Sequence, residues 1–277
     1  MNILFLGDLV GESIVAFLKK NLPNILTKYD ISFVIVNGEN IANGYGITPH
    51  LCDQLFEIGI DVISSGNHIW DQEKIIPYIA QQKKLIRPIN YSRNSPGQGI
   101  SKFTNKQGDK IVVINLSCNL FMQKANNAFS EIKDLLNNLK LKQDCDAIFI
   151  DLHGEAASEK QALAYMIDGQ VTAVLGTHTH VPTSDLRILP KGTAFQTDTG
   201  MCGDYDSVIG GEKQSWIEKF TSKGNYKKIN CSNKNITLCG SIVKVDKMSG
   251  LASVVEQIVI GGILKNIIPN EILFKNV

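Results

Sequence analysis

The stretch VTAVLGTHTH, residues 171–180, joins a short apolar run to two histidines that stand one residue apart. The apolar residues 171–175 indicate a buried strand that ends at Gly176. If the chain stays extended beyond that point, His178 and His180 project to the same side, so both imidazoles can face one point in space. Neutral imidazoles are common ligands of transition metals, but the same sequence is also compatible with two solvent-exposed loop histidines that bind no metal. The stretch therefore predicts a metal-binding strand end only if the rest of the chain supplies further ligands.

Short apolar runs alternate with helix-like segments on both sides of this stretch. Strands are expected over residues 2–6, 33–36, 61–65, 111–116, 147–150 and 171–175, and helices over residues 14–26, 49–58, 72–80, 127–139 and 158–167. Later apolar runs with turn residues between them predict two hairpins, over residues 186–197 and 241–260. This order predicts an α/β protein with two mixed sheets and helices outside. We interpret residues 1–277 as a single domain with a polar surface insertion near residues 210–235.

Composition and charge limit the classes of partner. With 43% hydrophobic residues, 20% charged residues and a net charge of +1, the chain has the composition of an ordinary globular protein. A charge so close to zero argues against extended contact with nucleic acid or with an anionic membrane surface. The six cysteines have no regular spacing, and the N-terminus lacks the basic start of a signal peptide. No apolar run approaches the roughly 20 residues of a membrane span, so we expect a cytoplasmic protein without membrane attachment.

Five expected strand ends carry side chains that can bind a metal. They are Asp8, Glu39, Asn67, His153 and the pair His178 and His180, and each of these loops also carries a glycine. The carboxyl ends of strands in an α/β sheet meet at one rim, so these loops can converge. Taken singly, an aspartate after a strand is more often a helix cap or turn residue, and a lone histidine is more often not a ligand. The coincidence at all five ends predicts one shared site and leaves His50 as a surface residue.

The chemistry of this donor set indicates more than one metal ion. It contains three imidazoles, two carboxylates and carboxamides, without a thiolate. Nitrogen and oxygen donors of this kind suit iron, manganese or zinc, and there are too many of them for one tetrahedral ion. Two ions that share a carboxylate fit the count better. Two ions about 3.5–4 Å apart can hold an activated hydroxide and clamp a phosphoryl group during in-line displacement, so the set predicts phosphoryl chemistry without a basic patch.

The same residues resemble the motif series of the calcineurin-like metallophosphoesterases. The motifs are Gly7-Asp8, Gly38-Glu39-Asn40, Gly66-Asn67-His68, His153 and Gly176-Thr177-His178-Thr179-His180. More narrowly, they are similar to the YmdB-type branch, in which Gly-Glu-Asn replaces the usual Gly-Asp-x-x-Asp. The resemblance extends over roughly the first three quarters of the chain. Because Asp8-Leu9-Val10 departs from the Asp-x-His motif of the wider superfamily, the two divalent ions implied are iron or manganese, with zinc or magnesium as alternatives.

The resemblance also implies a role for each residue. One ion would be bound by Asp8, Glu39, Asn40 and His180, and the other by Glu39, Asn67, His153 and His178, with Glu39 as the bridge. His68 would be catalytic rather than a ligand, and it would protonate the leaving oxygen or stabilise its charge. Asp71 could orient His68 as a hydrogen-bonding carboxylate.

The activity that the resemblance implies is hydrolysis of small-molecule phosphodiesters, with 2′,3′-cyclic nucleotides favoured, by attack of a hydroxide that bridges the two ions. The fold it implies is a four-layer α/β/β/α metallophosphoesterase sandwich, and members of the family form homo-oligomers. One alternative is a phosphomonoesterase of the 5′-nucleotidase kind, although the chain shows no arginine cluster to meet the extra charge. The other is a regulatory protein that binds a nucleotide or RNA and turns it over slowly. The sequence does not locate the nucleoside pocket, for which residues 43–48 and 203–207 are candidates.

Overall fold

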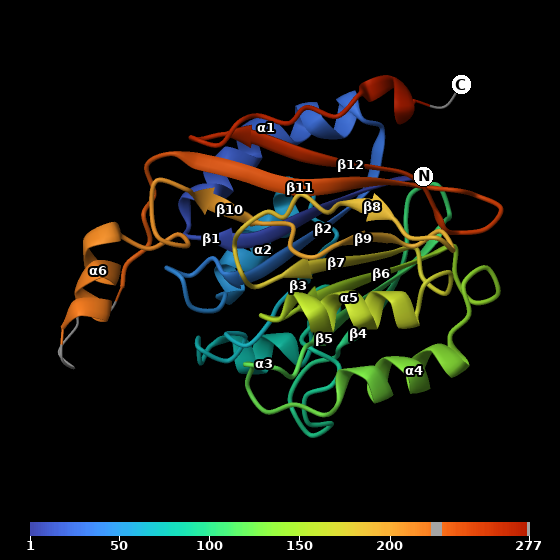
Figure 1. The fold of residues 1–277 in the computed structure, drawn as a ribbon, viewed down its shortest axis with the longest axis horizontal. Coiled ribbons are helices and arrows are strands. Elements are labelled where there is room, and N and C mark those ends of the chain that lie inside the picture. Colours follow the sequence, from blue (N-terminus) through green and yellow to red (C-terminus); the bar gives the residue numbers. More distant parts are fainter. Residues whose placement is uncertain (223–228, 276–277) are drawn as a thin grey trace.

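Two six-stranded sheets form the centre of the computed structural model, which describes residues 1–222 and 229–275 (Figure 1). In spatial order, the first sheet consists of β12 (Ala252–Gly261), β11 (Ile236–Val245), β10 (Met201–Asp204), β1 (Asn2–Val10), β2 (Ile31–Asn40) and β3 (Val62–Ser64). The second sheet consists of β4 (Ile100–Thr104), β5 (Lys110–Ser117), β6 (Ala147–His153), β7 (Ala173–Thr177), β9 (Ala194–Gln196) and β8 (Arg187–Ile188). Both sheets mix parallel and antiparallel pairs, as expected.

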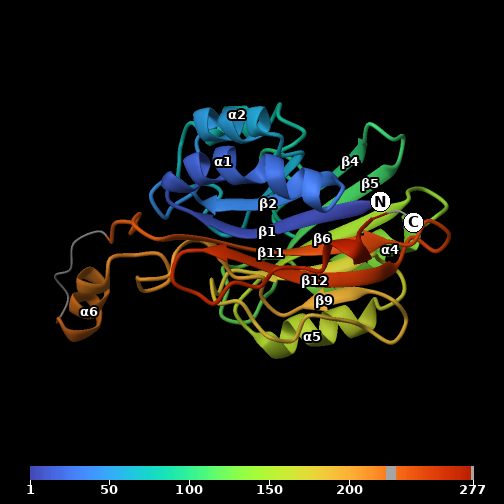
Figure 2. The same cartoon turned by 90° about the horizontal axis from the view of Figure 1, so that it is seen from above.

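Helices cover the outer face of each sheet (Figure 2). The helices α1 (Ser13–Lys28) and α2 (Pro49–Ile58) pack on the first sheet, and α4 (Ala128–Asn138) and α5 (Ala157–Met166) pack on the second. A third cluster of buried side chains, which includes Phe5 and Phe149, fills the space between the two sheets. These four layers confirm the expected α/β/β/α sandwich.

Local capping signals explain why α2 begins and ends, and why α4 begins, where the sequence predicts. The Thr48 hydroxyl accepts a hydrogen bond from the Leu51 N–H at 3.3 Å, Pro49 is the first residue of α2, and Gly59 ends the helix with φ at +107°. Asn127 caps α4 in the same way, by accepting from the Ser130 N–H at 3.0 Å. These interactions span only a few residues, so a single sequence reveals them.

The helix expected over residues 72–80 is much shorter in the structure, where α3 covers only Ile75–Ile79. Pro77 favours the later start, because proline has no N–H and its ring clashes with the carbonyl four residues earlier inside a helix; only the much longer α1 accommodates an interior proline, Pro23, among the described helices. A start at residue 72 would place Pro77 in the interior. A start at Ile75 places Pro77 in the first turn, where a helix tolerates it, so the expected start is wrong.

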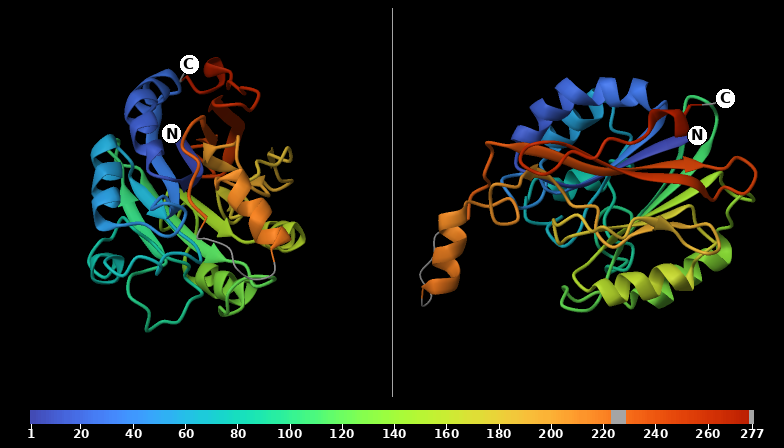
Figure 3. Two further views of the ribbon diagram at one scale, coloured as in Figure 1. Left: turned by 90° about the vertical axis from the view of Figure 1, so that its left-hand side faces the viewer. Right: turned by 45° about the horizontal axis from the view of Figure 1, so that its top comes forward.

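The polar stretch near residues 210–235 contains a helix that the sequence analysis did not predict. The helix α6 (Lys213–Thr221) buries none of its residues and stands out from the body of the molecule (Figures 1 and 3). The segments before and after it pair with each other through a bridge between Gly211 and Cys231. Residues 223–228 lie outside the described part of the chain. The described part of the insertion is therefore a helix on a short two-stranded base.

The carboxyl ends of both sheets meet at one rim. The strands β1, β2 and β3 are parallel to one another, as are β5, β6 and β7. Asn37 near the end of β2 donates to Asp151 near the end of β6 at 2.8 Å, so the two sets of strand ends lie together. This arrangement places the loops that carry the predicted ligands on one side of the molecule.

Neither a membrane-spanning helix nor a disulfide occurs in the part of the chain that the structure describes. No helix there has the length and apolar character to cross a bilayer. All six cysteines are free thiols, and five of them are buried. The single domain over residues 1–277 stays a prediction.

Candidate metal centre

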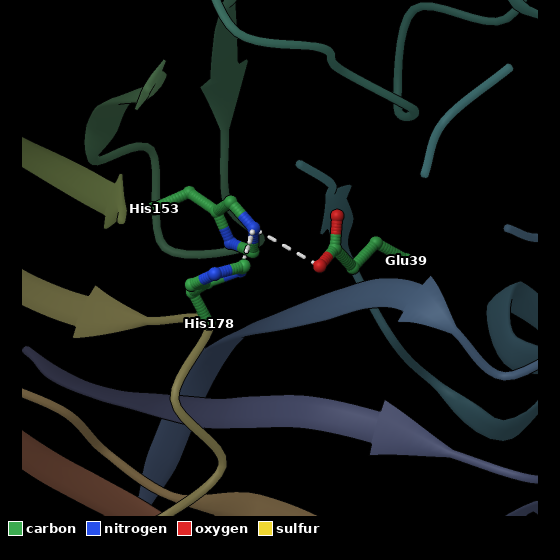
Figure 4. Close-up of side chains that lie close together, drawn as sticks. All are labelled: Glu39, His153 and His178. Carbon is green, nitrogen blue, oxygen red and sulfur yellow. Dashed lines mark hydrogen bonds and ion pairs between the residues drawn. The ribbon is translucent and has the colours of Figure 1, made fainter. Parts of the chain in front are cut away.

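All eight residues predicted as ligands or catalyst lie at the shared rim of the sheets. They are Asp8 in β1, Glu39 and Asn40 at the end of β2, Asn67 and His68 after β3, His153 at the end of β6, and His178 and His180 after β7. Each contacts at least one other member of the set through a hydrogen bond or an ion pair. Figure 4 shows Glu39, His153 and His178 approaching one another from different elements. The structure thus brings together the whole predicted set.

His153 Nε2 lies at the centre of the first group of donors. It is 3.0 Å from Glu39 Oε1, 3.1 Å from Asn67 Oδ1 and 3.1 Å from His178 Nδ1. His178 Nε2 lies 3.4 Å from Glu155 Oε2 and can donate its proton there, which leaves the Nδ1 lone pair directed at His153. One potential ligand atom from each of Glu39, His153 and His178 lies within 4.8 Å of the others. Three other atoms that can bind a metal therefore lie within 3.1 Å of His153 Nε2.

The opposite ring nitrogen of His153 fixes the tautomer. Nδ1 lies 2.9 Å from the Thr177 hydroxyl oxygen, and that hydroxyl donates to Asp151 Oδ1 at 2.6 Å. The only hydroxyl hydrogen of Thr177 is used in the hydrogen bond to Asp151. His153 Nδ1 must therefore be the donor in its hydrogen bond with the Thr177 oxygen. Nε2 then faces two oxygens and a nitrogen that all carry lone pairs. A proton on Nε2 satisfies only one of them, whereas a cation can bind all of them, so this group fits a metal ion.

His180 and Asn40 form a second group of donors, in which two lone pairs again face each other. His180 Nδ1 donates to the Ile209 carbonyl at 2.8 Å, which leaves the Nε2 lone pair 3.2 Å from Asn40 Oδ1. The Asn40 side-chain NH₂ donates to the Gly44 carbonyl at 3.1 Å, so its oxygen faces His180. Two acceptors that face each other repel unless a proton or a cation lies between them, so this pair can also bind a metal ion.

Asp8 lies beside His153 and His178, with Oδ1 4.0 Å from His153 Nδ1, and it lies inside a strand rather than after one. The strand β1 continues to Val10, and its pairing with β2 shifts register on both sides of Asp8. Asp8 Oδ2 accepts from the His178 N–H at 3.0 Å, while Oδ1 is buried without a hydrogen-bond partner. A buried carboxylate oxygen without a donor is costly, and a cation at this point would satisfy it.

The charges of these groups depend on one another. Burial raises the pKa of Glu39, but the nearby His153 outweighs burial and the net pKa falls to about 2. Burial lowers the pKa of His153, but the Glu39 carboxylate outweighs it and the net pKa rises to about 9. Burial raises the pKa of Asp8 to about 7, whereas burial and the His153 charge lower the pKa of His178 to about 3. These shifts favour an ionised Glu39 beside a protonated His153 in the metal-free protein, and a bound cation would take the place of the His153 proton.

Gly66 makes the approach of Glu39 and His153 possible. A Cβ atom at this position would lie 2.2 Å from Glu39 Oε2 and 2.3 Å from His153 Nε2. Real side chains do not tolerate such distances, so any other residue here would displace one of the two ligands.

The two histidines after β7 do not lie on an extended chain, as the sequence analysis assumed. His178 has φ at +103° and His180 has φ at +66°, both in the left-handed region that such residues rarely adopt. The chain therefore turns between them, and the imidazoles face different partners, His153 and Asn40. The expected convergence on one point is wrong, and each histidine serves its own group of donors.

A buried ion pair holds this turn in place. Lys160 on α5 donates to the Thr177 carbonyl at 2.7 Å and to Asp198 Oδ2 at 3.1 Å. The Asp198 carboxylate also accepts from the Thr179 N–H at 3.0 Å and from the Gly200 N–H at 2.9 Å. The pair therefore contacts the chain on both sides of His178 and offsets the cost of its left-handed conformation.

Four residues that support the ligands were missed from the sequence alone: Asp151, Thr177, Lys160 and Asp198. One signal was present, because Lys160 shares a helix face with Leu163 and Ala164, three and four residues on. A lysine within such an apolar face needs a buried partner. Nothing near Asp198 in the sequence marks it as that partner.

His68 lies beside the donors rather than among them. The backbone N–H of His68 donates to Glu39 Oε2 at 3.2 Å, and the ring Nδ1 is 2.7 Å from Asp71 Oδ2. The ring also makes an edge contact with Tyr45, with the centroids 5.5 Å apart. Because Asp71 engages Nδ1, Nε2 is the nitrogen that remains for a substrate.

A cavity of about 450 Å³ opens over both groups of donors. Its inner wall contains Glu39, Asn40, His68, His178 and His180, and its outer wall contains Tyr45, Ile209, Trp216, Lys219, Ile229, Asn230 and Cys231. Of the two segments considered for a nucleoside pocket, residues 43–48 contribute to the lining and residues 203–207 do not. The outer wall comes largely from the insertion that carries α6.

Comparison with known proteins places this geometry in a family. A family model described as YmdB-like protein matches residues 4–258. The 2′,3′-cyclic-nucleotide 2′-phosphodiesterase of Bacillus subtilis (strain 168) is 39% identical over 260 residues, which cover 94% of this chain and 97% of that protein. A crystal structure described as a novel phosphatase from Mycoplasma pneumoniae has 36% identity and a TM-score of 0.86, over 95% of this chain and 94% of its own. A hypothetical protein from Thermus thermophilus has 33% identity and a TM-score of 0.87, over 95% and 100%. These matches confirm the resemblance seen in the motifs and extend it beyond them.

Proposed function

Because this chain belongs to the YmdB-like protein family, we propose that it is a dinuclear metal-dependent phosphodiesterase that hydrolyses cyclic nucleotides, with 2′,3′-cyclic nucleotides favoured. The family and the Bacillus subtilis relative confirm the coarser prediction, that of an enzyme that hydrolyses phosphoric diesters. The two ions, their ligands and the nucleotide are the finer part of the proposal.

The observation that carries the proposal is the pair of donor groups whose lone pairs face one another. Glu39, Asn67, His153 and His178 would hold one ion, and Asp8, Asn40 and His180 would hold the other, with Glu39 shared. The donors are nitrogen and oxygen atoms, which accept iron or manganese readily and also zinc or magnesium. Two bound ions would supply an activated water nucleophile and neutralise the charge on the phosphoryl group.

The chain's own residues then act on the leaving group. His68 lines the cavity, and its Nδ1 is hydrogen-bonded to Asp71. Its Nε2 can therefore donate a proton to the sugar oxygen as the bond between that oxygen and phosphorus breaks. Thr177 and Asp151 hold His153 in one tautomer, and Lys160 with Asp198 holds the turn that carries His178 and His180.

Replacement of Glu39 by alanine tests the assignment. We expect the variant to bind less metal per chain, measured by mass spectrometry of the elements, and to lose hydrolysis of 2′,3′-cyclic AMP. Glu57→Ala, which removes an exposed carboxylate on α2, is the matched control and should keep both. Full metal content and full turnover in Glu39→Ala would contradict the proposal. Assays on 2′,3′-cyclic, 3′,5′-cyclic and linear diesters then define the preferred substrate.

The description of the Mycoplasma pneumoniae structure as a phosphatase favours a second candidate, a phosphomonoesterase. A monoester carries an extra negative charge, for which arginine is the usual partner. No arginine is among the described residues that line the cavity. Arg87 is bound to main-chain carbonyls, and Arg187 is paired with Asp185. We therefore expect faster hydrolysis of bis(4-nitrophenyl) phosphate than of 4-nitrophenyl phosphate under the same metal conditions, and the reverse order would favour the monoesterase.

A third candidate is the slow regulatory binder of a nucleotide or RNA. A protein that only binds has no need of two donor groups and of His68. Recovery of an intact nucleotide, bound tightly to fully metal-loaded protein, would favour this candidate. A homo-oligomeric state, which the family resemblance implies, and a cytoplasmic location, which the sequence predicts, remain part of the proposal.

A further inference from the structure

The two ends of the cavity over the metal centre differ in chemistry. The inner end presents carboxylate, carboxamide and imidazole groups, while the outer end presents the side chains of Trp216, Lys219, Ile229 and Asn230. The cavity volume of about 450 Å³ lies within the range of about 300–1,000 Å³ that is typical of small-molecule sites. A phosphate group alone would fill only the inner end. The outer end is therefore available to the remainder of the substrate.

Backbone contacts join the outer wall to the metal centre. The Ile209 carbonyl accepts from His180 Nδ1 at 2.8 Å, and Gly211 follows two residues later. A Cβ atom on Gly211 would lie 2.4 Å from Trp216 Nε1 and 2.6 Å from Ile229 Cγ2, so both side chains pack directly on this glycine. The position of the indole is thus set by the same segment that orients a predicted ligand.

The loop after β2 holds the wall from the other side. The Asn43 side chain accepts from the Cys231 N–H at 3.0 Å and donates to the Asn230 side-chain oxygen at 3.4 Å. This loop begins directly after Asn40 and carries Tyr45, whose ring contacts His68. The two ends of the cavity are therefore linked through β2 as well as through His180.

The outer wall suits a flat aromatic ligand with a polar edge. The Trp216 indole stacks against Phe220, with the ring centroids 5.7 Å apart and the planes at 24°, and the Lys219 ammonium, which lines the cavity, lies 4.6 Å from the centre of the indole. Phe220 is not among the described residues that line the cavity, so a nucleobase can stack on the indole from the cavity side in place of the Lys219 ammonium, which can then donate to an acceptor on the edge of the base. We infer that the outer half of the cavity is a nucleobase subsite, in which Trp216 is the stacking surface and Lys219 meets the edge of the base. This inference rests on the proposed function, because it assumes a nucleotide whose phosphate lies at the metal centre.

Tryptophan fluorescence tests the subsite without any hydrolysis. The chain has two tryptophans, and Trp70, which packs partly against the core of the first sheet, is not among the cavity residues. Trp70→Phe therefore leaves Trp216 as the sole emitter. Adenosine added to this full-length, manganese-loaded protein should quench the emission in a saturable way, and inorganic phosphate should not. Absence of quenching by adenosine would overturn the inference.

Variants on α6 supply the matched comparison. Trp216→Ala should weaken adenosine binding, measured by equilibrium dialysis, by about tenfold or more, and Trp216→Phe should keep most of the affinity because a ring remains. Ile217→Ala is the control, because Ile217 is 53% exposed on the same helix and does not line the cavity. Equal affinity in Trp216→Ala and Ile217→Ala would overturn the inference. Because adenosine carries no phosphate, its binding supports the subsite even if cyclic nucleotides prove not to be hydrolysed, and the two proposals fail separately.

The same variants can be tested in turnover if the protein hydrolyses 2′,3′-cyclic AMP. Trp216→Ala should raise KM for this substrate at least about fivefold more than for methyl 4-nitrophenyl phosphate, which has no base. An equal effect on both substrates would show that Trp216 acts on the fold of the cavity and not on a base, and would overturn the inference.

Discussion

Replacement of Lys160 by methionine should destabilise the metal-free protein by about 3–5 kcal/mol, because a buried carboxylate loses its cation. Lys160 and Asp198 are both fully buried, with Nζ 3.1 Å from Asp198 Oδ2 and 2.7 Å from the Thr177 carbonyl. Methionine keeps a long apolar side chain and removes the charge. The carboxylate would then retain the N–H donors of Thr179 and Gly200, which do not neutralise it.

Thermal unfolding followed by circular dichroism in the presence of a chelator measures this effect. About 2–4 °C per kcal/mol applies to a chain of this size, so we expect the midpoint of Lys160→Met to fall by about 10 °C. Lys20→Met, which replaces an exposed lysine on α1, should leave the midpoint nearly unchanged. The double variant Lys160→Met with Asp198→Asn should recover much of the loss, because neither partner then remains charged. A midpoint for Lys160→Met within about 2 °C of the parent would refute the role of the ion pair.

Three further predictions concern the centre itself. In metal-free protein, His153 has a folded pKa of about 9, above its ordinary 6.5, so its contribution to stability is complete below pH 6.5 and is lost as the pH rises to 9. Glu39, with a folded pKa of about 2, contributes to stability above its ordinary pKa of 4.5 and loses that contribution as the pH falls to 2. Unfolding midpoints that fell neither toward high pH nor toward low pH would contradict both assignments. Gly66→Ala should lower metal affinity by at least about tenfold, because its Cβ would displace a ligand, and unchanged affinity by isothermal titration would count against the close packing. Thr177→Val should lower metal affinity by about 10–100-fold, because His153 loses the acceptor that sets its tautomer, and Thr177→Ser should restore most of it.

The predicted site depended on features that are local in the sequence. A strand that ends in glycine and a polar residue is visible within a few positions, and Asp8, Glu39, Asn67 and His153 were each found in this way. The parallel arrangement of α/β sheets then brings such ends to one rim, so convergence could be inferred without knowledge of any single distance.

The features that the sequence did not reveal depend on contacts between distant segments. The left-handed turn at His178 is held by Lys160 and Asp198, which are 18 residues before it and 20 residues after it. The wall around Trp216 depends on the fit of that side chain to Gly211, which no periodicity encodes. The shorter α3 is a local exception, because Pro77 is visible in the sequence and favours a start later than residue 72.

Anomalous diffraction from crystals soaked in Mn²⁺ tests the central claim most directly. We predict two peaks about 3.5–4 Å apart, one between Glu39, Asn67, His153 and His178 and the other between Asp8, Asn40 and His180, with Glu39 in contact with both. A single peak, or peaks away from these side chains, would contradict the assignment of a two-ion centre.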